Sequence, residues 1–91
     1  MVVAMKTSRL NGSQRAEAGR KKYMNAINRL ESANKKAQKI AAKAPQNKVV
    51  ASFSVSIKNQ LARGIVADEK LALRYAKAAE LNLAKLIAAA T

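Results

Sequence analysis

Residues 13–44 read SQRAEAGRKKYMNAINRLESANKKAQKIAAKA. Sorted on a seven-residue repeat, this segment places small or apolar residues along one side. The three heptad positions of that side hold Ala16, Tyr23, Leu30, Ala37 and Ala44; Arg20, Ile27, Asn34 and Ala41; and Gly19, Ala26, Ala33 and Ile40. A seam of this kind is typical of an amphipathic helix that packs against neighbouring helices. The segment therefore predicts one long helix with a largely apolar face.

Positive charge gathers on the opposite side of this predicted helix. A cation recurs every seven residues, and three lysines widen the row. The predicted site residues are Arg15, Lys22, Arg29, Lys36 and Lys43, with Lys21, Lys35 and Lys39 beside them. The five-member row spans about 42 Å at about 1.5 Å per residue, and no acid lies three or four residues from any member. Unpaired Lys and Arg are what binding to a phosphate backbone requires, so we expect the row to contact a polyanion.

The composition sets limits on the size of the core and on the partners. The chain has 91 residues, 18 Lys and Arg against 5 Asp and Glu, and a net charge of +13. Twenty residues are alanine, whose burial contributes little apolar area. We expect one small domain that gains stability from an oligomer, a larger assembly or a bound polyanion. Nucleic acid, an anionic membrane or an acidic protein would neutralise the charge.

Catalytic chemistry has little support in this sequence. It contains no Cys and no His, and its three glycines stand apart, so thiol nucleophiles, zinc-finger ligation and glycine-rich phosphate loops are excluded. Glu17 and Glu31 would lie about 21 Å apart along a helix, too far to act together. We therefore predict neither an enzyme nor a cofactor.

The rest of the chain predicts an all-α fold of three helices over about 13–44, 47–63 and 68–90. Residues 1–12 are expected to form a flexible basic arm, and 13–91 a single helical domain. Ser13 is the expected N-cap of the long helix, which Pro45 ends. Residues 49–58 also alternate like a strand, but the recurrence at helical spacing and the lack of a partner strand favour a helix. Gly64 fits a helix C-cap and Asp68 an N-cap.

Large residues before Gly64 and alanines with an aromatic residue after Asp68 follow the layout of a helical hairpin. The segment resembles a single unit of tetratricopeptide-like or Sel1-like repeats in geometry, over roughly 30 residues and without their full signatures. One unit alone does not make a solenoid, which needs about three.

Polar and aromatic residues of the chain have two interpretations. Asn25, Asn28 and Asn34 lie on the basic helix and suggest contacts to base edges, but Asn34 is better explained as a polar seam residue that fixes helix register. Three aromatic residues fall on apolar faces. We therefore interpret them as core residues rather than as platforms on which bases stack. The three residues are Tyr23, Phe53 and Tyr75.

Two functions are compatible with these features. The first is nucleic-acid backbone binding without sequence specificity, as part of a larger nucleoprotein assembly. The second is a structural subunit of a virion, tail or filament whose charge meets acidic protein surfaces. No run approaches the ~18 apolar residues of a spanning helix and no signal peptide is evident, so we expect a cytoplasmic location or a nucleoprotein or virion particle.

Overall fold

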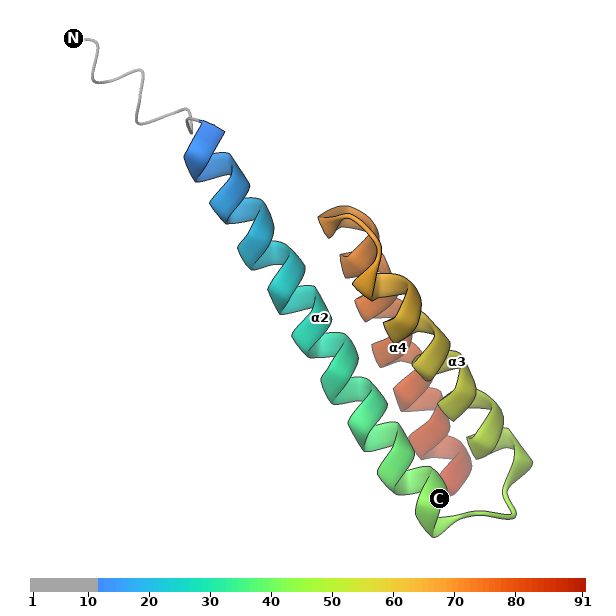
Figure 1. The fold of residues 1–91 in the computed structure, drawn as a ribbon. Helices are drawn as coiled ribbons and strands as arrows, with labels where there is room; N and C mark the ends of the chain where they lie inside the picture. The colour runs from blue at the N-terminus through green and yellow to red at the C-terminus, as the bar shows by residue number, and fades with distance from the viewer. Residues whose placement is uncertain (1–11) are drawn as a thin grey trace, which may run out of the picture.

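The computed structural model describes the backbone of residues 12–91 and the side chains of residues 19–91. Residues 12–91 form three α-helices and no strand (Figure 1). The helices are α2 (Gly12–Lys43), α3 (Lys48–Ile65) and α4 (Glu69–Ala90). The predicted all-α, three-helix fold is therefore confirmed, and the ambiguous segment 49–58 is helical within α3. Of the predicted arm over residues 1–12, residues 1–11 lie outside the described residues, and Gly12 is part of α2.

The three helices lie side by side, and each packs against the other two (Figure 1). α3 runs antiparallel to α2, and α4 returns parallel to α2. At about 1.5 Å per residue, the 32 residues of α2 span about 48 Å, against about 27 Å for α3 and about 33 Å for α4. The Tyr23 hydroxyl donates a hydrogen bond to the Ile65 carbonyl at the α3–α4 turn. The first turns of α2 therefore extend beyond the hairpin (Figure 1).

The core consists of small and medium side chains contributed by all three helices. Its buried hydrophobic residues are Ala26, Ile27, Leu30, Ala33, Ala37, Val50, Ile57, Ala72, Ala76, Ala79 and Leu86. The α2 members all belong to the predicted seam, so the predicted apolar face is correct. Alanine is the commonest residue in this core, which lets the helices pack closely but limits the apolar area that each contact removes from water.

Gly64 has a different role from the one predicted. α3 continues through Gly64 to Ile65, and Val66 is its C-cap, so the prediction of Gly64 as a C-cap is wrong. Gly64 is buried, and a Cβ placed on it would collide with Cδ1 of Leu30 on α2. The absence of a side chain therefore serves the packing of α3 on α2 rather than the end of the helix.

Side-chain caps define the starts of the two shorter helices. Asp68 Oδ1 accepts a hydrogen bond from the Leu71 amide at 2.8 Å, which confirms its predicted role. Asn47 Oδ1 accepts from the amides of Val49 and Val50, each at 3.1 Å. The predicted cap at Ser13 lies outside the described side chains.

The three aromatic residues lie against the core, as the sequence analysis expected. Tyr23, Phe53 and Tyr75 are partly buried and pack against the buried cluster.

Within the described part of the chain, none of the helices has the length and apolar character needed to cross a membrane.

Candidate nucleic-acid interface

The lysines of the predicted cation row are exposed to solvent along α2, while Arg29 and Lys36 of the row also border α4. The six exposed lysines of the row are Lys21, Lys22, Lys35, Lys36, Lys39 and Lys43. The buried residues of α2 hold the opposite side of the helix against α3 and α4. Amphipathic packing therefore orients these lysines towards solvent. The side chain of Arg15 lies outside the described side chains.

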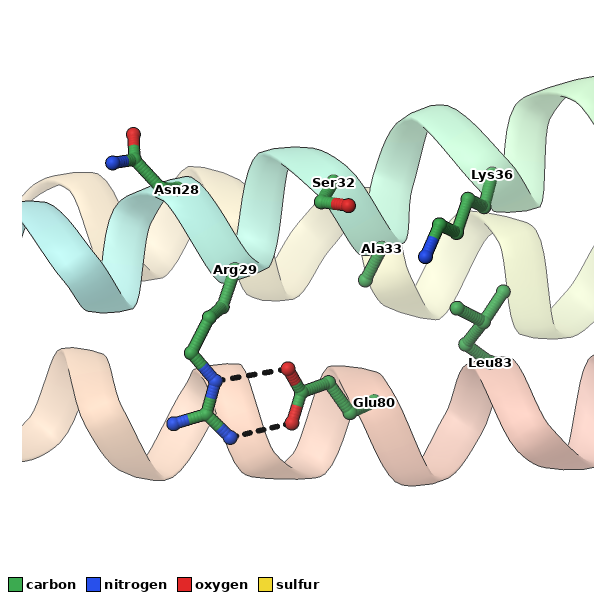
Figure 2. Close-up of a pocket in the computed structure, with 7 residues that line it drawn as sticks. All are labelled: Asn28, Arg29, Ser32, Ala33, Lys36, Glu80 and Leu83. Atoms are coloured by element: carbon green, nitrogen blue, oxygen red, sulfur yellow. Dashed lines mark hydrogen bonds and ion pairs between the residues drawn. The ribbon is translucent and has the colours of Figure 1, made fainter.

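Arg29, at the centre of the row, has a partner on another helix. Its Nε donates to Glu80 Oε2 at 2.9 Å, and its Nη2 donates to Glu80 Oε1 at 2.5 Å (Figure 2). This is a bidentate ion pair between α2 and α4, and the two side chains are 39% and 43% exposed. The hydrogen bonds from Arg29 hold the pKa of Glu80 below its usual value, while partial burial opposes this and the charges of Arg29 and Lys36 reinforce it.

The pair removes Arg29 from the unpaired cations of the predicted row. No acid on α2 compensates this residue, but Glu80 lies 51 residues away in the chain and reaches it through the fold. The sequence predicts Arg29 as one of the cations that contact a polyanion. In this structure Glu80 accepts two hydrogen bonds from Arg29, so the row of unpaired cations is interrupted at its centre.

Among the side chains of residues 19–91, the remaining carboxylates form no ion pair with the other cations. Asp68 caps α4, Glu31 is exposed, and Glu69 places its carboxylate over the backbone of α2 at Gly19. Across these residues, Arg29–Glu80 is the one ion pair within 4.0 Å. The exposed lysines of α2 are therefore available to an external anion.

Positive charge also continues beyond the predicted row. Exposed cations of α2, α3 and α4 outside the prediction are Arg20, Lys48, Lys58, Arg63, Lys70, Arg74, Lys77 and Lys85. The charge is denser on α2, where Lys35, Lys36 and Lys39 fall within five residues. We therefore take α2 as the principal basic surface and the hairpin as a weaker one.

A shallow groove follows the α2–α4 boundary beside the ion pair. Its volume is about 250 Å³, and it is lined by Asn28, Arg29, Ser32, Ala33, Lys36, Glu80 and Leu83 (Figure 2). Arg29, Lys36 and Glu80 bring two cations and one carboxylate to this groove, and Ala33 and Leu83 are its apolar lining residues. The sequence contained no local sign of this groove, because α4 joins it only through the tertiary packing.

The asparagines of α2 separate into two environments. Asn25 and Asn28 are exposed beside the lysines. Asn34 is half-buried and its Oδ1 accepts a hydrogen bond from Gln38 Nε2 at 3.3 Å, while the same nitrogen donates to the buried Ser54 of α3 at 3.0 Å. This placement at the α2–α3 boundary supports the register interpretation of Asn34 over base reading.

Comparison with protein-family models, curated proteins and solved structures gives no significant match for this chain. A functional assignment therefore starts from the charge and geometry of the basic surface.

Proposed function

We propose that this protein binds the phosphate backbone of nucleic acid through the exposed side of α2, without preference for base sequence. The observation that carries the proposal is the set of six exposed lysines on one helix, none of which has a carboxylate partner among the described side chains. Their mechanism is neutralisation of phosphates with release of condensed counterions.

The length of the basic surface matches several phosphates. Lys22 and Lys43 are 21 residues apart, which corresponds to about 32 Å along a helix. Phosphates of one DNA strand follow at about 3.4 Å along the duplex axis, so the surface runs past about nine of them. Lysine is a flexible point charge that reaches phosphates without fixing base register. Binding independent of sequence follows from this chemistry.

A salt titration tests the proposal. We expect a fluorescently labelled duplex to bind with an affinity that falls steeply between 50 and 200 mM salt, with a log–log slope of about −5 if all six lysines contact phosphates. Two duplexes of unrelated sequence should give the same affinity to within about twofold, since phosphate contacts carry no sequence information.

Two charge variants locate the interface. The first replaces the six exposed lysines of α2 by Gln. The control replaces six cations of the hairpin by Gln, namely Lys48, Lys58, Arg63, Lys70, Lys77 and Lys85, so both variants lose the same charge. We expect the α2 variant to lose most of the salt slope and the control to keep most of it. No binding by the wild type at 50 mM salt, or equal losses in the two variants, would refute the proposal.

A structural subunit remains the second candidate function, because large hydrophobic side chains are exposed on the hairpin. Val55, Val66 and Leu81 are 57%, 85% and 58% exposed, and covering such residues is what a protein interface achieves. Light scattering on protein freed of nucleic acid tests this function. Assemblies that dissociate when Leu81 is replaced by Gln would support it, whereas a stable monomer at high concentration argues against it.

A further inference from the structure

We propose that the α2–α4 groove is a phosphate-binding subsite. In the free protein, the Glu80 carboxylate occupies the position that a phosphate takes when nucleic acid binds. The inference rests on the proposed function and adds one named position to it. Glu80 then acts as an internal competitor for the nucleic-acid backbone, and Arg29 joins the interface when a phosphate replaces the Glu80 carboxylate.

The geometry of the ion pair supplies the first part of the argument. Arg29 presents Nε and Nη2 side by side, and each donates to a different oxygen of the carboxylate (Figure 2). Arginine binds phosphate with the same two parallel hydrogen bonds. The two Glu80 oxygens therefore mark where two oxygens of a phosphate group would lie.

The surroundings of the pair favour an anion larger than a carboxylate. The Lys36 ammonium points back towards the groove, and Ser32 and Asn28 line the α2 side of it (Figure 2). Lys36 is among the charges that lower the pKa of Glu80, so its field reaches the position of the carboxylate. A phosphate there would meet the Arg29 guanidinium and the field of the Lys36 ammonium.

Exchange of the two anions is energetically accessible. Both members of the pair are more than one third exposed, and an ion pair in such a position contributes little to stability because water screens it. Glu80 can turn into solvent without leaving a buried charge behind. The exchange therefore lets a nucleic acid recruit a cation that the free protein keeps paired.

A charge-matched pair of substitutions tests the subsite. Glu80→Gln and Glu31→Gln remove one negative charge each, but Glu31 is exposed and belongs to no ion pair among the described side chains. We expect Glu80→Gln to raise duplex affinity at 100 mM salt by about threefold to tenfold and to steepen the salt slope by about 0.9, which is one additional phosphate contact. Glu31→Gln should change affinity by less than about twofold and leave the slope unchanged, because among the described side chains Glu31 holds no cation that a phosphate would have to win from it.

The same substitutions in an Arg29→Gln background show whether Arg29 carries the effect. There, Glu80→Gln should raise affinity no more than Glu31→Gln does. Thermal unfolding establishes that each variant is folded. In the wild type, the NMR resonance of the Arg29 Nε–H group should shift as duplex is added, which gives a readout independent of any variant.

The outcomes separate this inference from the proposed function. Steep, α2-dependent binding with equal effects of Glu80→Gln and Glu31→Gln, or with an unmoved Arg29 resonance, overturns the subsite and leaves the proposed function standing. Absence of duplex binding by the wild type removes both.

Discussion

At the scale of single residues, the contact of Gly64 with Leu30 shows how closely α3 packs on α2. Leu30 is fully buried, and its Cδ1 occupies the space that a side chain at Gly64 would take. Leu30→Ala should destabilise the fold by about 2–5 kcal/mol, because it leaves a cavity in the core. Gly64→Ala made in that background should place a methyl group into the cavity.

A double-mutant cycle measured by urea unfolding tests this contact. We expect the double variant to be more stable than the sum of the two single effects predicts, by at least about 0.5 kcal/mol. Strictly additive effects would show that the two residues do not share the space.

Glu80 provides the second prediction at this scale. Glu80→Gln should destabilise the free protein by no more than about 1 kcal/mol, because the pair is partly exposed. The pKa of Glu80 is lowered in the folded protein, so its stabilising contribution is present above the unfolded-state pKa of about 4.3 and is lost as pH falls through the folded-state value.

Urea unfolding of wild type and Glu80→Gln at several pH values tests the sign of this linkage. The difference in unfolding free energy should be constant from pH 7 down to about pH 5 and should shrink towards zero at lower pH. A difference that grows on acidification would contradict the ion pair.

At the scale of helices, Asn47 joins the beginning of α3 to the end of α4. Its Oδ1 accepts from two α3 amides, and its Nδ2 donates to the Ala89 carbonyl at 3.0 Å. Asn47→Ala should lower the unfolding free energy by about 1–2 kcal/mol through loss of the cap. Asn47→Asp retains the capping oxygen and loses the donor, so thermal or urea unfolding should show a smaller loss. Equal losses would mean that the bond to Ala89 dominates.

At the scale of the whole molecule, the net charge of +13 opposes compaction. We expect added salt to raise the melting temperature of the free protein, because screening reduces the self-repulsion. Duplex added at 50 mM salt should raise the melting temperature further, since a ligand of the folded state stabilises it. Calorimetry at 50 and 200 mM salt tests this prediction, and the effect of duplex should be much smaller at the higher salt. Destabilisation by duplex at both salt concentrations would indicate preferential binding to the unfolded chain.

The helices were predictable because their signals are local. Heptad spacing identified Leu30 and Ala37 as core residues, and a lone aspartate before an apolar run identified the cap at Asp68. The role of Gly64 was not predictable from the local sequence. A glycine near the end of a helix can end the helix or can leave space for a side chain of a neighbouring helix, and the surrounding residues are the same in both cases. The strand-like alternation of residues 49–58 did not prevent a helix, since two neighbouring helices bury one side of it.

The sequence by itself determined the amphipathic rods and the side of α2 on which most lysines lie, because both depend on spacing along one helix. Only the tertiary structure decided that Arg29 is paired while Lys22 and Lys36 have no carboxylate partner among the side chains of residues 19–91. The physical reason is that ion pairing acts through space, and α4 brings Glu80 to Arg29 from a part of the chain that no helical period connects to it.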